Sequence, residues 1–117
     1  ELSRLSGVPE QDLTHVLADC NANQQSLYFC AWRDQLAEDI KLRQLLERKI
    51  LATPHCKRSF EAQINAWERS RNRSCDESAK KQWGEGSMRP TASTLCKAKA
   101  TERMNRRLER ARSCKIR

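Results

Sequence analysis

The placement of the cysteines restricts most strongly how this chain can fold. The segment Gly84–Ser87 contains two glycines and a serine, residue types that favour a tight turn. Cys75 and Cys96 flank this turn at nearly equal distances, and so do Cys56 and Cys114. If the two flanking segments are antiparallel helices, the four cysteines face one another in two rungs about 28 Å apart, at about 1.5 Å rise per residue. The spacing therefore predicts a helical hairpin stapled by disulfides.

This nested arrangement selects one pairing among the many that six cysteines allow. The predicted disulfides are Cys56–Cys114, Cys75–Cys96 and, by remainder, Cys20–Cys30. A zinc site is the alternative use of cysteines, but only His15 and His55 could join them. No four ligands cluster in the sequence as they do in structural zinc sites, so we expect no bound metal. Disulfides indicate an oxidising compartment.

Export to such a compartment usually requires a leader, and we expect that one preceded residue 1. The chain contains no apolar run long enough to span a membrane. Its net charge of +8 is divided unevenly. Residues 1–56 hold 6 Lys and Arg against 8 Asp and Glu, whereas residues 57–117 hold 17 against 7. An anionic partner is therefore expected to bind the second half.

Apolar residues recur at helical spacing in four segments. The predicted helices span about residues 9–18, 26–51, 57–82 and 92–115. Ser26 is a suitable N-cap for the second helix, and Thr91 or Ser93 for the last. In the second helix the predicted buried face contains Phe29, Trp32, Leu36, Ile40 and Leu46, broadened by Leu42 and Leu45. We predict a single all-α domain over residues 1–117, a small three- to four-helix bundle built on a long antiparallel helical hairpin.

The phase of the cysteines adds a further expectation about the two arms. Cys96 and Cys114 are 18 residues apart, a whole number of helical turns, so they would face the same way on the last helix. Cys56 and Cys75 differ by about 100° around a helix axis. We therefore expect Cys56 in the loop just before its helix.

A series of short motifs runs in a fixed order through about residues 19–108. The motif residues are Asp19-Cys20, Cys30, Ala37-x-Asp39-x2-Leu42, then Gln63, Trp67, Arg71 and Cys75 at intervals of four, then Gly86-Ser87, Cys96, and Thr101, Arg103 and Leu108. This series resembles the LprI-like lysozyme-inhibitor family, a group of secreted or periplasmic bacterial domains. The resemblance implies an inhibitor rather than an enzyme, and a structural role for Asp39, Gln63, Trp67, Arg71, Thr101 and Arg103.

Three features depart from the family pattern. Arg43 stands where the family has asparagine, and the double glycine of the turn is split as Gly84-Glu85-Gly86. Cys56 and Cys114 are additional to the two cysteine pairs of the family. Because function depends on sites rather than on the fold, fold and compartment follow from the resemblance more directly than the target does.

Arg71 lies on an apolar helix face between Trp67 and Cys75. An unpaired buried charge is very unfavourable, so we predict a structural arginine that pairs with a carboxylate, with Asp39 the first candidate. The alternative is a target-binding arginine. The turn offers a second candidate site, because an aromatic and an arginine beside a glycine-rich loop could enter an enzyme cleft. Alternatively, the glycines only close the turn and Trp83 covers the core.

The last helix carries most of the positive charge. Arg103 and Arg107 share the face of Cys96 and are expected to pair inward, whereas Arg106, Arg110 and Arg117 fall on an outer face. This outer face is a solvated surface, a contact for an acidic protein, or a contact for an anionic polymer. The candidate target-binding residues are Trp83, Gly86, Ser87, Met88, Arg89, Arg106 and Arg110.

No nucleophile with a base, phosphate-binding loop or metal motif is present, so we expect neither catalysis nor a cofactor. The first hypothesis is a binding protein, an inhibitor or immunity protein that blocks a lysozyme-like or other envelope-targeting enzyme. Animal-type lysozyme is basic and would be repelled, so an acidic hydrolase or toxin is the better partner. The alternative is a basic envelope protein that binds an anionic polymer such as nucleic acid or lipopolysaccharide.

Overall fold

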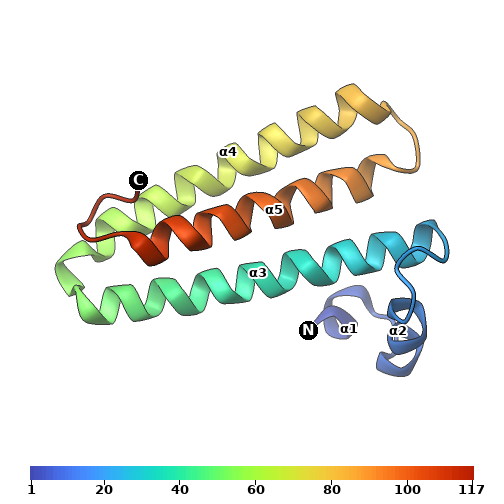
Figure 1. Cartoon of the computed structure of the whole chain (residues 1–117), viewed down its shortest axis with the longest axis horizontal. Helices are drawn as coiled ribbons and strands as arrows, with labels where there is room; N and C mark the ends of the chain where they lie inside the picture. Colours follow the sequence, from blue (N-terminus) through green and yellow to red (C-terminus); the bar gives the residue numbers. More distant parts are fainter.

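Three long helices form the body of the molecule in the computed structural model, which describes residues 1–117 (Figure 1). They are α3 (Gln24–Ala52), α4 (Lys57–Trp83) and α5 (Arg89–Arg110). A 3₁₀ turn, η1 (Pro54–Cys56), joins α3 to α4, and a short loop joins α4 to α5. α4 and α5 are antiparallel, as predicted, and α3 runs in the same direction as α5. The fold is all-α, a bundle stapled by disulfides.

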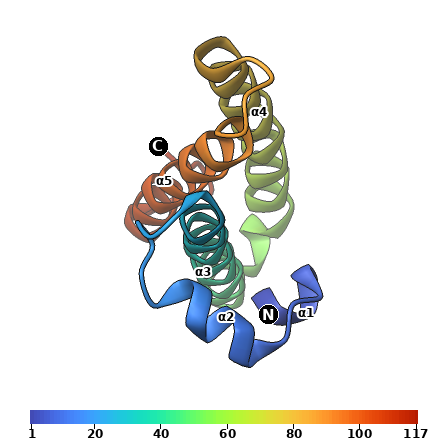
Figure 2. The ribbon, with the colours of Figure 1, turned by 90° about the vertical axis from the view of Figure 1, so that its right-hand side faces the viewer.

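Two short helices precede the bundle and lie beside α3 (Figures 1 and 2). They are α1 (Leu2–Ser6), which was not predicted, and α2 (Glu10–Leu17), which agrees with the predicted helix at 9–18. Each buries one leucine, Leu2 in α1 and Leu13 in α2. None of the helices combines the length and the apolar character that a membrane span requires.

The starts of α3 and α5 correct two predicted caps. Asn23 caps α3, and its Oδ1 accepts a hydrogen bond of 2.8 Å from the backbone N–H of Ser26, which lies inside the first turn. α5 begins at Arg89 with a proline in its first turn, where the fixed proline φ suits a helix start. Thr91 and Ser93 are therefore buried helix residues and not caps.

The end of α5 corrects a third prediction. The helix ends at Arg110 and not at residue 115, and residues 111–117 form a tail that turns back toward α4 (Figure 1). Lys49 of α3 caps this end of the helix, since its Nζ donates hydrogen bonds of 3.0 Å to the carbonyl oxygens of Glu109 and Ala111. Ile116 is buried in the core.

The three disulfides join the cysteines that the spacing paired. They are Cys20–Cys30, Cys56–Cys114 and Cys75–Cys96, with Cα–Cα distances of 5.7, 5.0 and 5.6 Å. Cys56 lies in η1 just before α4, as the phase argument predicted. Cys114 lies in the tail and not on α5, so the prediction that Cys96 and Cys114 face the same way on one helix was wrong. The folded-back tail brings Cys114 to Cys56.

The hydrophobic core lies at the end of the bundle where α3 meets α4 and where α5 ends. Its buried residues are Leu42, Leu45, Cys56, Phe60, Ile64, Met104, Leu108 and Ile116. The predicted face of α3 was only partly right, since Phe29, Trp32, Leu36 and Ile40 are half-buried. At the opposite end, α4 and the loop after it project away from α3 (Figure 2). The molecule is accordingly elongated, 46 × 34 × 21 Å.

Leu108 tests the position of this core. Its side chain is fully buried, so Leu108→Ala should lower the free energy of unfolding by about 2–5 kcal/mol through lost contacts and a cavity. Leu51→Ala makes the same change at a residue that is 80% exposed and should change it by less than about 0.5 kcal/mol. Urea denaturation of the oxidised proteins measures both. Equal effects would contradict the assignment of the core.

Candidate functional site

Arg71 connects the three long helices near the middle of the bundle. Its side chain is only 5% exposed. Nη1 donates a hydrogen bond of 2.9 Å to Thr101 Oγ1 of α5, and lies 3.2 Å from Asp39 Oδ1 of α3. Asp39 is the partner that the sequence named, and a carboxylate here offsets the penalty of burying the guanidinium charge.

The remaining contacts of Arg71 come from its own helix. Nε and Nη2 donate to Asn72 Oδ1 at 3.0 and 2.8 Å. The guanidinium also lies over the ring of Trp67, 5.2 Å from its centroid, at a distance typical of a cation–π contact. Because all three nitrogens have acceptors within the chain, this geometry supports the structural role of Arg71.

Gln63, another residue of the motif series, holds the tail against α4. Its Nε2 donates a hydrogen bond of 2.6 Å to the carbonyl oxygen of Cys114, and its Oε1 accepts one of 2.9 Å from the backbone N–H of Ile116. The nearby Ser59 Oγ donates to the same Cys114 oxygen at 3.0 Å. The resemblance implied a structural role for Gln63, but the sequence did not indicate the tail as its partner.

The exposure and the ion pairs of the arginines in α5 differ from the prediction. Arg103 and Arg107 are exposed and make no ion pair, so the expected inward pairing was wrong. The reason is that α5 turns its most buried side chains toward α3: Asn105 Nδ2, for example, donates to Glu38 Oε2 at 2.8 Å. Arg106 pairs with Glu102 at 3.1 Å on the surface.

The loop between α4 and α5 is closed by a tight turn over Trp83–Gly86. Gly84 has φ +57° and ψ −127°, and the Gly86 N–H donates to the Trp83 carbonyl oxygen at 2.9 Å. These values match a type II′ turn, whose first central position requires glycine. A Cβ on Gly86 would lie 2.9 Å from the Trp83 carbonyl oxygen. The split double glycine therefore has a local structural cause.

The side chains of this loop are partly available to a partner. Trp83 is 43% exposed and does not belong to the buried hydrophobic cluster. Ser87 is exposed, whereas Met88 and Arg89 are half-buried. Arg89 Nη1 pairs with Glu85 Oε1 at 2.9 Å. We call residues 83–89 the hairpin tip.

The structure separates the candidate target-binding residues into two groups. Trp83, Gly86, Ser87, Met88 and Arg89 lie at the hairpin tip, whereas Arg106 and Arg110 lie near the other end of α5. Arg89 and Arg110 are the first and last residues of α5, about 30 Å apart at the rise of an α-helix. The two groups cannot form one compact site.

Tyr28 was missed by the sequence analysis. Together with Gln24 and Gln25 of α3 it lines a shallow hollow whose other side is Ser87, Pro90 and Thr91. Its ring lies 5.8 Å from that of Phe29 and 5.9 Å from that of Trp32. The start of α3 thus adds an aromatic residue beside the hairpin tip, and nothing in the sequence spacing placed it there.

Asp76 ties α4 to α5 near the hairpin tip. Its Oδ1 accepts a short hydrogen bond from Ser93 Oγ and lies 3.1 Å from Lys97 Nζ. The Ser93 hydrogen bond first, and then Lys97, hold the pKa of Asp76 below its ordinary value of 3.8, although partial burial opposes the shift. With the Cys75–Cys96 disulfide, these contacts fix the arm that carries the tip.

One group of side chains is close enough to hold a metal ion: His55, Cys56 and Cys114 offer ligand atoms within 4.8 Å of one another. Cys56 and Cys114 are joined as a disulfide, so neither sulfur is available as a thiolate ligand. The arrangement fits a disulfide with a neighbouring imidazole.

Residues 18–108 match the family model described as Lysozyme inhibitor LprI. The chain belongs to this family. The match confirms the resemblance expected at residues 19–108, and it contains the Arg71 network, Gln63 and the hairpin tip. The LprI family is one of inhibitors, so the chain is a binding protein and not an enzyme. No curated protein and no solved structure matches the chain.

The Arg71 network makes a prediction about Asp39. Asp39→Ala should lower the free energy of unfolding by about 1.5–3 kcal/mol, because a nearly buried guanidinium loses a charged acceptor. Asp34→Ala removes an exposed carboxylate whose partner Arg33 is also exposed, and should have an effect of less than about 1 kcal/mol. Urea denaturation compares the two. An Asp39 effect no larger than that of Asp34 would contradict the structural role of Arg71.

The pKa of Asp76 makes a prediction about pH. Because its pKa is lower in the folded chain than in the unfolded chain, its contribution to stability is present above about pH 4 and is lost as pH falls through the lower folded value. The stability difference between the native protein and Asp76→Asn should therefore shrink on acidification below pH 4. Thermal melts over a pH series measure it, with the exposed neighbour Glu77→Gln as control. A constant difference would contradict the prediction.

Proposed function

We propose that this protein is a secreted or periplasmic inhibitor that binds and blocks a lysozyme-like or other envelope-degrading enzyme. Membership of the LprI family is the observation that carries this proposal. Three disulfides and no free cysteine support an oxidising compartment. The inhibitor acts by occupying its target and not by a reaction of its own.

The hairpin tip is the segment that we expect to contact the target. It lies far from the core, at the end of the molecule where α4 projects (Figure 2). Trp83 supplies an aromatic anchor of the kind that dominates protein interfaces. The type II′ turn and the Cys75–Cys96 disulfide hold the anchor in place before binding, so little conformational freedom is lost on association.

Charge favours an acidic target enzyme. The chain carries a net charge of +8, and Lys80 and Lys81 lie exposed in the last turn of α4, without ion pairs, beside Trp83. Complementary charge raises the rate of association, whereas a basic enzyme would be repelled at long range. We therefore expect acidic lysozyme-like hydrolases or toxins to be bound in preference to basic lysozymes.

Trp83 tests the proposal. In a peptidoglycan-lysis assay with a panel of acidic and basic lysozyme-like enzymes, the oxidised protein should inhibit at least one enzyme at near-equimolar ratio. Trp83→Ala should weaken that inhibition by about 30-fold, the effect of losing one interface anchor. Arg89→Ala should weaken it less, because Arg89 is already paired with Glu85.

Leu51→Ala provides the matched control. It also truncates an exposed apolar side chain, but at the end of α3 that is remote from the hairpin tip, and should leave inhibition unchanged. If Trp83→Ala inhibits as well as the native protein, the tip is not the docking segment. If no enzyme of the panel is inhibited, the proposal of a lysozyme-like target is wrong.

A further inference from the structure

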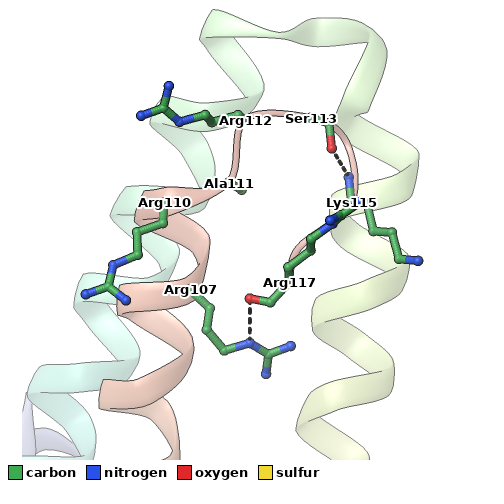
Figure 3. A pocket seen from close by; sticks show the side chains of 7 residues that line it. All are labelled: Arg107, Arg110, Ala111, Arg112, Ser113, Lys115 and Arg117. Carbon is green, nitrogen blue, oxygen red and sulfur yellow. Dashed lines mark hydrogen bonds between the residues drawn. The ribbon is translucent and has the colours of Figure 1, made fainter.

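The tail and the end of α5 line an open basic hollow of about 290 Å³ (Figure 3). Its lining residues are Arg107, Arg110, Ala111, Arg112, Ser113, Lys115 and Arg117. Five of the seven have a positively charged side chain and none has an acidic one. Most of them lie beyond residues 18–108, so the family match assigns no role to this site.

The walls of the hollow are fixed by the fold. The Cys56–Cys114 disulfide anchors the tail covalently to the start of α4. Ile116, which is 7% exposed, anchors it in the core, and Gln63 accepts from the Ile116 backbone N–H. The backbone of the site is therefore held in place before any ligand arrives, by a disulfide, by apolar burial and by hydrogen bonds.

No acidic side chain pairs with the positive charges in the hollow. None of the five cationic side chains pairs with an Asp or Glu side chain, although Arg106 in the adjacent turn pairs with Glu102. Cations near a helix C-terminus can serve to offset the helix dipole. Here Lys49 already donates to the carbonyl oxygens of Glu109 and Ala111. Capping of α5 therefore leaves most of these charges without a structural role.

Arg107 is oriented for binding an oxyanion. Its Nε donates a hydrogen bond of 3.1 Å to a backbone oxygen of Arg117, which directs the guanidinium across the mouth of the tail loop (Figure 3). The terminal Nη groups have no acceptor in the chain, and such a fork matches two oxygens of one phosphate group. Arg110 and Arg112 extend on the other side of the tail, where their long side chains are free to turn toward a bound anion.

We infer that the basic hollow binds a diphosphate-class anion, meaning two neighbouring phosphate groups. A single carboxylate would neutralise only one of five clustered cations, whereas two phosphate groups carry several charges in a volume that 290 Å³ accommodates. The two phosphate groups belong either to a free diphosphate or to the phosphorylated headgroup of an envelope lipid. Both present the same chemistry to Arg107, and neither depends on the proposed inhibition of an enzyme.

Isothermal titration calorimetry with inorganic pyrophosphate tests the inference on the oxidised protein at low salt. Binding should be at least about tenfold tighter than that of inorganic sulfate, because pyrophosphate carries more charge and can contact several cations. Arg107→Gln combined with Arg110→Gln should weaken pyrophosphate binding at least about tenfold, the effect of losing one charge-assisted hydrogen bond or more.

Arg69→Gln combined with Arg73→Gln is the matched control. It removes the same charge from two exposed, unpaired arginines of α4 and should leave pyrophosphate binding within about twofold. Equal losses in the two double variants would show a general effect of net charge and overturn the inference. Undetectable pyrophosphate binding, or equal affinity for a glutamate-rich peptide, would overturn it as well. Because all four arginines are exposed, both variants should fold, and thermal melts check this.

Vesicles distinguish the two sources of the phosphate groups. If vesicles with a diphosphate lipid bind the protein much more tightly than vesicles of a monoester phospholipid at equal surface charge, and only with Arg107 and Arg110 present, the lipid headgroup is the source. If free pyrophosphate binds and the two kinds of vesicle do not differ, a soluble diphosphate is the source. Inhibition of an enzyme plays no part in any of these measurements.

Discussion

Two disulfides, which attach α5 to α4 and the tail after α5 to η1, are the constraint on which the rest of this structure depends. Seven residues of α5 are buried, but only Met104 and Leu108 among them have large apolar side chains. A helix with so narrow an apolar stripe is marginal by itself. Cys75–Cys96 ties its first half to α4, and Cys56–Cys114 ties the tail that follows it. In the chain-entropy model, cross-links of such separation each stabilise a fold by about 3–4 kcal/mol.

Polar contacts hold the three long helices together where the small hydrophobic core does not reach. The hydrophobic cluster occupies one end of the bundle, and beyond it the three helices meet at the guanidinium of Arg71. Asn105 and Lys49 add contacts between α3 and α5. A buried polar network of this kind fixes the relative position of the helices, because each donor has few acceptors within reach. It explains why an arginine stands on an apolar helix face.

Much of this arrangement could be predicted from the sequence. The symmetric cysteines indicated the hairpin and the pairing, and the penalty for a buried charge indicated the Arg71–Asp39 pair. The end of α5 could not be predicted, because Lys49 caps it and Gln63 holds the tail that follows it, both from distant parts of the chain. No stop signal precedes Cys114, and the whole-turn spacing from Cys96 suggested a longer helix. The prediction that Arg103 and Arg107 pair inward was wrong for a related reason, since α5 faces α3 more than α4.

The two candidate sites also differ in whether the sequence could predict them. The glycines at 84 and 86 marked the hairpin tip, because only glycine satisfies the turn that the structure contains. The basic hollow was not predictable, since Arg112, Lys115 and Arg117 reach Arg107 only after the tail folds back. Charge composition alone showed a basic half of the chain but not a site.

The two proposed sites lie at opposite ends of α5, about 30 Å apart at the rise of an α-helix. An enzyme docked on the hairpin tip would therefore leave the basic hollow open, and an anion in the hollow would not cover Trp83. Beyond about 8–10 Å, salt screens the interaction between exposed charges, so occupation of one site changes the electrostatic potential at the other very little. The geometry thus allows a protein held on a phosphate-bearing envelope surface to present its tip to a target in solution.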